Sequence, residues 1–257
     1  MHHPYIDKYA ELDSPIHRID PRVKIICAIL IILGIIFTEP TSAVSFICYG
    51  IFLSILVILS RIPVSFILAR SSVVIPFVIM IAIFIPFVKE GKVAGAYSFG
   101  TLKLTVTYNG LVILLNVLVK SYLSVLCMTV FTASLKFSVL LKAFERLKFP
   151  NLLIMIFSFM YRYIFVVIDE LMHVKQAKDS RTVGGGRLSH TKTLANVLGV
   201  LFVRSYERAE SVYIAMRSRG FNGTINTLYD FRLRVADIAF VVIVLGFVAI
   251  ARFSSAI

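Results

Sequence analysis

Residues 104–135 read LTVTYNGLVILLNVLVKSYLSVLCMTVFTASL, and this stretch decides the class of fold. Lys120 is its single charged residue. A helix that crosses a bilayer needs about 20 predominantly apolar residues. We therefore expect one long, tilted helix here, with Lys120 at a helix interface or reaching the headgroup region. The stretch predicts an integral membrane protein.

The rest of the chain has the same character. Of its 257 residues, 58% are hydrophobic and only 16% are charged, which leaves too little polar surface to cover a water-soluble globule. The other apolar runs are residues 25–38, 41–60, 71–88, 149–168 and 238–251. The predicted fold class is all-α: a polytopic helical membrane protein with about five transmembrane helices plus amphipathic cytoplasmic helices.

Two segments between these runs carry local signals. Pro76 and Pro86 should kink the run 71–88, and residues 89–103 are polar and contain glycine. We expect a loop there, with a short extended segment over 97–104. Three widely spaced cysteines, Cys27, Cys48 and Cys127, lie in apolar runs; without a CxxC pair they indicate neither a disulfide framework nor a metal site.

Charge predicts the orientation. The formal net charge is +13, and Lys and Arg are enriched in cytoplasmic loops, so the basic stretches 136–148 and 169–234 should be cytoplasmic. The run 149–168 then lies along, or dips into, the cytoplasmic side. A six-span arrangement, with 149–168 and part of 104–135 rearranged, is the alternative. Because topology explains the charge, we expect a multi-pass protein of the cell's inner (plasma) membrane that binds lipid and no nucleic acid.

The predicted organisation has four parts. Residues 1–24 form a cytoplasmic N-terminal segment, and residues 25–135 form transmembrane helices 1–4. Residues 136–235 form a cytoplasmic helical region, and residues 236–257 form the final transmembrane helix.

Two places in the basic region resemble each other. Residues 177–182 read AKDSRT and precede three glycines, and residues 215–221 read AMRSRGF. Each has a small residue directly before an arginine near the end of a predicted helix, and Gly220 is suited to end its helix. The candidate residues are Ser180, Arg181, Ala215, Ser218, Arg219 and Gly220.

A guanidinium at such a helix end can pair with a carboxylate or a helix C-terminus in the groove of a partner. Arginines near helix C-termini and on cytoplasmic faces are also common without any partner. The helix before Arg219 is amphipathic, with an apolar face of Val197, Leu201, Val212 and Met216 that suits the membrane surface.

The sequence resembles the transmembrane coupling (T) component of energy-coupling factor transporters, within it the CbiQ type of cobalt or nickel uptake systems. The resemblance rests on YIDKYA at 5–10, HRIDPRVK at 17–24 and AMRSRGFNG at 215–223. The family has two short Ala-Arg-Gly-like signatures at the ends of its coupling helices. Ser218-Arg219-Gly220 matches the second, and Ser180-Arg181-Thr182 matches the first loosely, with Thr in place of Gly.

The resemblance implies a scaffold that is not an enzyme. Two ATP-binding (CbiO-like) subunits would bind at Arg181 and Arg219. A substrate-binding membrane (CbiM-like) subunit, with or without a CbiN-like one, would pack against other helices and carry cobalt or nickel. The chain lacks the GxxxxGK[ST] phosphate loop, so the implied ATP is bound by the partner subunits and no cofactor is expected in this chain.

Two other classes of protein compete with this interpretation. A secondary transporter with its own substrate path tends to carry ionisable residues at mid-membrane. In this chain, Lys120 and Arg162 are the exceptions, as ionisable residues inside otherwise uncharged apolar runs. An intramembrane enzyme would draw on His2, His3, His17, His173 and His190, but there is no HExxH motif. His2 and His3 alone make a poor metal site.

Overall fold

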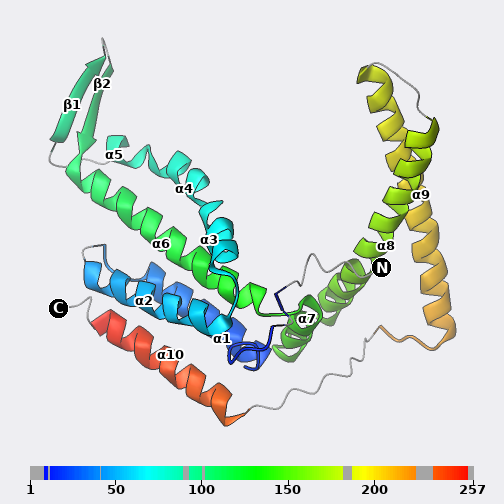
Figure 1. The fold of residues 1–257 in the computed structure, drawn as a ribbon, viewed down its shortest axis with the longest axis horizontal. Helices are drawn as coiled ribbons and strands as arrows, with labels where there is room; N and C mark the ends of the chain where they lie inside the picture. Colours follow the sequence, from blue (N-terminus) through cyan, green and yellow to red (C-terminus); the bar gives the residue numbers. More distant parts are fainter. Residues whose placement is uncertain are drawn as a thin grey trace. The chain divides into compact units, whose positions relative to one another are not determined.

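The computed structural model describes residues 9–10, 12–40, 42–88, 93–99, 102–181, 187–223 and 234–253. The chain divides into two compact units, 4–136 with 230–257 and 137–229 with 1–3. We call the first the helix bundle and the second the α7–α9 unit, and each is described by itself (Figure 1). The predicted all-α fold is confirmed, with one small β-hairpin added among the described residues.

The elements of the two units follow in chain order. The helix bundle contains α1 (Pro21–Ile36), α2 (Ala43–Ser60), α3 (Val64–Ser72), α4 (Ile75–Ala82), α5 (Ile85–Val88), β1 (Val93–Phe99), β2 (Leu102–Thr107), α6 (Tyr108–Ala133) and α10 (Val235–Phe253). The other unit contains α7 (Phe137–Arg146), α8 (Asn151–Arg181) and α9 (Arg187–Ser218).

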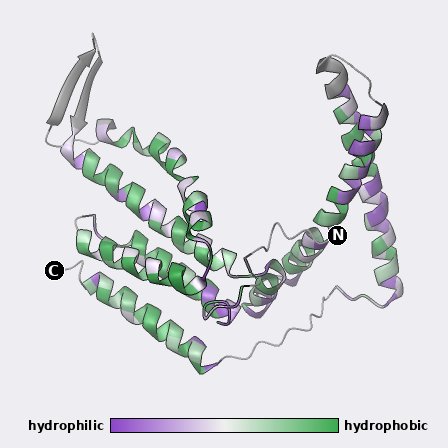
Figure 2. Ribbon diagram, viewed as in Figure 1, coloured by the Kyte–Doolittle hydropathy of each residue, from purple (hydrophilic) through white to green (hydrophobic). Residues whose placement is uncertain are grey.

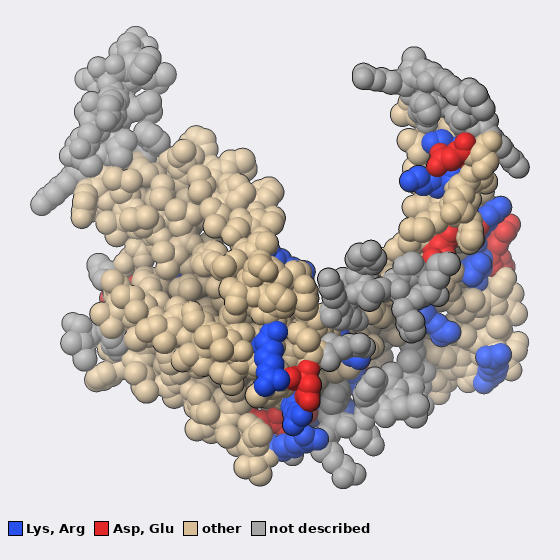
Figure 3. Space-filling view, in the orientation of Figure 1, with Lys and Arg blue, Asp and Glu red and all other residues tan. Residues whose placement is uncertain are grey.

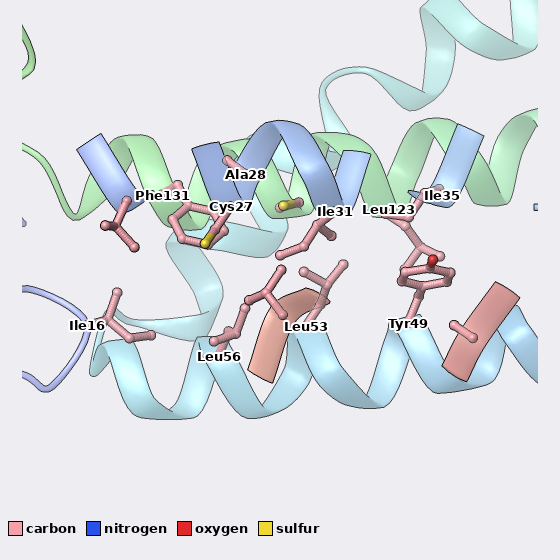
Figure 4. Close-up of a cluster of buried hydrophobic side chains, with 14 residues drawn as sticks. Ile16, Cys27, Ala28, Ile31, Ile35, Tyr49, Leu53, Leu56, Leu123 and Phe131 are labelled. Carbon is pink, nitrogen blue, oxygen red and sulfur yellow. The ribbon is translucent and has the colours of Figure 1, made fainter. Parts of the chain in front are cut away.

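Helix α6 is the centre of the bundle. It is a single helix of 26 residues, about 39 Å long at 1.5 Å per residue, so the prediction of one long helix from 104–135 is confirmed. Helices α1 to α5 all contact α6. The core lies between α1, α2, α6 and α10 (Figure 4). Helices α1 and α2 approach so closely that a Cβ at Gly34 would lie 2.6 Å from Tyr49 Oη.

Two prolines interrupt the helical hydrogen bonds of the run 71–88. The chain forms α3, α4 and α5 in succession, and Pro76 and Pro86 are each the second residue of their helix. At this position no backbone N–H is needed for a helical hydrogen bond. Val73 and Val74, between α3 and α4, keep right-handed helical dihedral angles, so Pro76 bends the helical path, as predicted. Helix α5 packs against α6 at Gly110, where a Cβ would lie 2.5 Å from Pro86 Cα.

The predicted loop 89–103 is wrong at residues 93–96, which belong to a strand, whereas the expected extended segment is confirmed at 97–99 and 102–104. Strands β1 and β2 form an antiparallel hairpin in which Phe99 pairs with Leu102 and Tyr97 pairs with Leu104. The expected extended segment thus includes the end of β1 and the start of β2. The register shifts between Val93 and Gly95, as a bulge does by placing an extra residue in one strand.

Five helical segments are long and apolar enough to cross a membrane: 43–60, 64–82, 108–133, 151–180 and 235–253. The number agrees with the predicted five, but the set differs. Helix α1, predicted to cross, has only 16 residues. Helix α8, which was predicted to stay on the cytoplasmic side, is long and apolar enough to cross. Figure 2 shows the bundle helices hydrophobic on most of their faces. Which side each loop occupies stays a prediction.

A buried polar cluster joins three helices at one end of the bundle. The Asp237 carboxylate, only 3% exposed, accepts hydrogen bonds from the backbone N–H of Asp20 at 2.8 Å and of Arg234 at 2.7 Å. Asp20 caps α1 by accepting from Arg22 N–H at 2.9 Å. Lys24, 1% exposed, donates to the Ser134 carbonyl at 3.1 Å. We call Asp20, Lys24 and Asp237 the polar clasp, because they tie the start of α1 to the start of α10 and the end of α6.

The opposite end of α1 is held by two cations. Lys120 Nζ, on α6, donates to the carbonyls of Ile36 at 2.9 Å and Thr38 at 2.6 Å. Arg252, in the last turn of α10, donates to the Phe37 carbonyl at 2.8 Å. The last carbonyls of a helix lack partners within it, and its dipole favours a cation there. Lys120 therefore lies at a helix interface, as predicted, and its role there is to donate hydrogen bonds to the end of α1.

Candidate partner-binding site at the ends of helices α8 and α9

Helix α8 is continuous across the predicted boundary at residue 169. It runs for 31 residues, about 46 Å, although the sequence changes from apolar to charged within it. No glycine or proline occurs between Asn151 and Arg181, so no residue interrupts the backbone hydrogen bonds. A change in polarity alters what surrounds a helix and does not end it.

Helices α8 and α9 pack against each other as an antiparallel pair. An ion pair joins Glu170 on α8 to Arg204 on α9. Near the end of α9, the ring of Phe221 lies edge-on to that of Phe159 with 6.4 Å between centroids. Between the helices lies a groove of about 490 Å³, lined by Tyr163, Val166, Val167, Glu170, Arg204, Ser205, Glu207, Arg208, Ala209 and Ser211.

The face predicted to be apolar on α9 is the more buried one. Val197, Leu201, Val212 and Met216 are all half-buried. Leu198, Phe202 and Tyr206 are exposed instead, at 61%, 74% and 66%. The amphipathic pattern thus identified the packed face, although this face lies within a helix pair and was expected to lie on the membrane.

Helix α9 ends in a Schellman motif around the predicted site. Phe221 N–H donates to the Met216 carbonyl at 3.1 Å, and Gly220 N–H donates to the Arg217 carbonyl at 3.0 Å. Gly220 has a φ of +78°, which glycine adopts without a steric penalty. Its predicted role at the end of the helix is confirmed. The motif leaves Ala215, Ser218 and Arg219 exposed, and the Ser218 hydroxyl donates to the Ile214 carbonyl at 3.0 Å.

The first signature lies at the end of α8. Ser180 is exposed, and its hydroxyl donates to the Gln176 carbonyl at 2.9 Å, the same local bond that Ser218 makes. Arg181 is the last residue of the helix. Its side chain and Thr182 lie outside the described residues, and so do the three glycines.

The structure does not bring the two arginines together. Because α8 and α9 run in opposite directions, the end of α8 lies near the start of α9, and Arg219 follows the other end of α9. Helix α9 has 32 residues, which places about 48 Å of helix between the two signatures. The candidate site therefore consists of two separate ends of the α8–α9 pair.

The histidines do not form a metal centre in the described part of the chain. There, no three His, Cys, Asp or Glu side chains lie close enough together to hold a metal ion. His17 bonds through its ring to the Ser14 hydroxyl at 2.7 Å and to the Tyr9 carbonyl at 3.0 Å, and burial lowers its pKa. His2 and His3 lie outside the described residues, as does the side chain of His190. Cys27, Cys48 and Cys127 are free thiols in the structure.

Comparison with known proteins places this geometry in context. The profile of the CbiQ family, described as a cobalt transport protein, matches residues 13–229. The chain is 28% identical over 229 residues to the energy-coupling factor transporter transmembrane protein EcfT of Streptococcus thermophilus, covering 85% of each.

Two further relatives match over most of their length. The EcfT protein of Streptococcus equi is 27% identical over 254 residues, which is 94% of this chain and 93% of the relative. An uncharacterized protein of Methanocaldococcus jannaschii is 27% identical over 240 residues, or 92% of this chain and 81% of the relative.

Proposed function

Because the chain belongs to the CbiQ family, we propose that it is the transmembrane coupling subunit of an ATP-driven energy-coupling factor importer. It is a multi-pass membrane protein without catalytic activity of its own. It transmits motion from two ATP-binding subunits to a substrate-binding membrane subunit. The matches to EcfT proteins over most of both chains support this role.

The observation that carries the proposal is the placement of the two signatures at opposite ends of the α8–α9 pair. Two ATP-binding subunits need two separate docking points, and about 48 Å of helix α9 separates these. At one end the Schellman motif of Gly220 exposes Arg219, whose planar guanidinium suits a carboxylate or a helix C-terminus in a groove. Arg181 plays the same role at the other end. The Glu170–Arg204 pair lies between them and the Phe159–Phe221 contact lies beside Arg219, and these contacts let the two helices move together.

We assign cobalt or nickel as the transported ion. The family's description as a cobalt transport protein supports this assignment. A CbiM-like membrane subunit, with or without a CbiN-like one, binds the ion, and CbiO-like subunits bind the ATP. The N-terminal segment and the region 136–235 face the cytoplasm, where those ATP-binding subunits are found.

Reconstitution tests the proposal. The chain is purified alone and together with two ATP-binding subunits and a membrane substrate subunit encoded beside its gene, and each preparation is placed in liposomes. Only the complete complex should hydrolyse ATP and import radioactive cobalt or nickel. Hydrolysis by the chain alone, or ion uptake without ATP, would count against the proposal.

Lys120 distinguishes this function from secondary transport with a substrate path in this chain. Replacing it with Met removes two charge-assisted hydrogen bonds to the end of α1. We expect unfolding to become easier by about 1–2 kcal/mol, while ATP-dependent uptake by the complex stays within about twofold of the original rate, a shift below 1 kcal/mol. Denaturation in detergent and uptake by liposomes measure the two effects. Loss of uptake by a folded Lys120→Met variant would favour the secondary transporter.

A further inference from the structure

A pocket of about 480 Å³ opens at the end of the helix bundle that holds the polar clasp. It is lined by Asp13, Ser14, Pro15, Arg18, Ile19, Arg61, Arg234, Ala236 and Asp237. These residues come from the N-terminal segment, the end of α2 and the start of α10. Figure 3 shows Lys and Arg, with some Asp and Glu among them, at one end of the bundle, whereas the rest of the visible face is almost free of charge.

The sequence positions of the arginines fix the depth of this pocket in the membrane. Arg61 directly follows the apolar segment 43–60, and Arg234 directly precedes the apolar segment 235–253. A residue that immediately flanks a membrane-crossing segment lies at the level of the lipid headgroups. Because both line one pocket, this pocket lies at that level, beside the phosphates of one leaflet.

Two of the three guanidinium groups are available to a ligand. Arg18 is engaged, since it donates to both Asp13 oxygens at 2.9 and 2.8 Å. Within the described residues, no carboxylate forms an ion pair with Arg61 or Arg234. The Asp237 carboxylate is buried and already accepts two backbone hydrogen bonds. Arg61 and Arg234 are both exposed at the pocket.

The backbone of Arg61 supplies an independent observation. This residue ends α2 in the left-handed conformation, with a φ of +56°. Glycine is the usual residue there, and a side chain makes the conformation less favourable. Among the described residues, Lys148 is the only other non-glycine residue with positive φ. Residues in such conformations cluster at ligand-binding sites, and Arg61 lines the pocket.

We propose that this pocket binds the phosphate group of an anionic phospholipid, held by Arg61 and Arg234. Guanidinium groups bind phosphate oxygens through paired hydrogen bonds, and basic pockets between transmembrane helices bind acidic lipid headgroups. The lipid bridges the end of α2 and the start of α10, next to the polar clasp. This proposal does not depend on the transport function.

Arg61→Gly tests the site without straining the fold, because glycine suits the left-handed position. Lys148→Gly is the matched control: it makes the same replacement at the other left-handed basic residue, in the α7–α9 unit. The full chain is placed in nanodiscs of phosphatidylcholine containing increasing phosphatidylglycerol, and retained lipid is measured by native mass spectrometry.

The original chain should retain phosphatidylglycerol in preference to phosphatidylcholine. At about 1 kcal/mol per basic residue, Arg61→Gly should lower the affinity for phosphatidylglycerol about fivefold, and Arg61→Gly with Arg234→Gln about 25-fold. Lys148→Gly should leave the affinity unchanged. Equal retention of the two lipids, or an unchanged affinity in Arg61→Gly, overturns the proposal. Inorganic phosphate in the buffer should not displace the lipid; displacement would identify a soluble phosphate as the ligand and overturn the assignment to a lipid.

Discussion

Replacing both Arg181 and Arg219 with Glu is expected to abolish co-purification of the ATP-binding subunits. Each replacement puts a carboxylate where the proposal requires a guanidinium bonded in a groove of the partner. Losing one member of such a pair costs about 2–5 kcal/mol, so each contact weakens at least about 30-fold. Because the two helix ends are far apart and on one chain, the effects should add. Affinity purification of the tagged chain from membranes, followed by gel quantification, measures the retained subunits.

The single variants and a control on the same helix sharpen this result. Arg219→Glu alone should leave one docking point intact, and the retained ATP-binding subunit should fall to about half, as expected for independent sites. Arg217→Glu makes the same change of charge in the last turn of α9, outside the Ser218-Arg219-Gly220 signature. It should leave co-purification unchanged. Full retention in the double variant, with normal membrane insertion, would contradict the role of both arginines.

Asp237→Asn is expected to cause a large loss of stability in the helix bundle. The buried carboxylate accepts one hydrogen bond at each oxygen, from Asp20 N–H and Arg234 N–H. An amide keeps one acceptor and turns an NH₂ group toward the other donor, which leaves two buried donors facing each other. Removing a charge-assisted bond and leaving a buried donor unsatisfied costs about 2–4 kcal/mol. Denaturation in detergent, followed by circular dichroism, measures the change.

Asp13→Asn is the matched control for this prediction. Asp13 pairs with Arg18, and the two side chains are 74% and 68% exposed. Exposed ion pairs contribute at most about 1 kcal/mol, so this variant should remain close to the original chain in stability. Equal losses in the two variants would mean that the burial of Asp237 does not determine its contribution.

The apolar runs predicted the helices because hydrophobic length is a local property. Residues 41–60 became α2 and 104–135 contained α6, each within a few residues. The signal for continuity in α8 was also present, since no glycine or proline separates Asn151 from Arg181. The change from apolar to charged residues at Asp169 does not end the helix, which continues to Arg181. The hairpin had a signal too: residues 102–107 read LKLTVT, an alternation with the period of a strand.

No local sequence pattern predicted the hydrogen bonds of the polar clasp or those from Lys120 to the end of α1. Asp20 and Asp237 are 217 residues apart, and the residues around Asp237 do not indicate which distant group it binds. For the candidate site, the sequence identified the helix ends and the glycine that terminates α9. It did not identify the separation of the two arginines, because that separation depends on the antiparallel packing of α8 with α9, fixed by contacts such as Phe159 with Phe221.

The position of α10 in the bundle has a consequence for biogenesis. This last helix supplies Asp237 to Asp20, Arg252 to Phe37 and the carbonyl of Ala251 to the buried Ser45 hydroxyl. The ribosome makes chain at about 5–20 residues per second, so α1 waits roughly 10 to 40 seconds for these partners. During that interval the nascent chain holds unsatisfied polar groups beside the bilayer. The polar contacts of α1 and α2 with α10 can therefore form only after the last helix has been made.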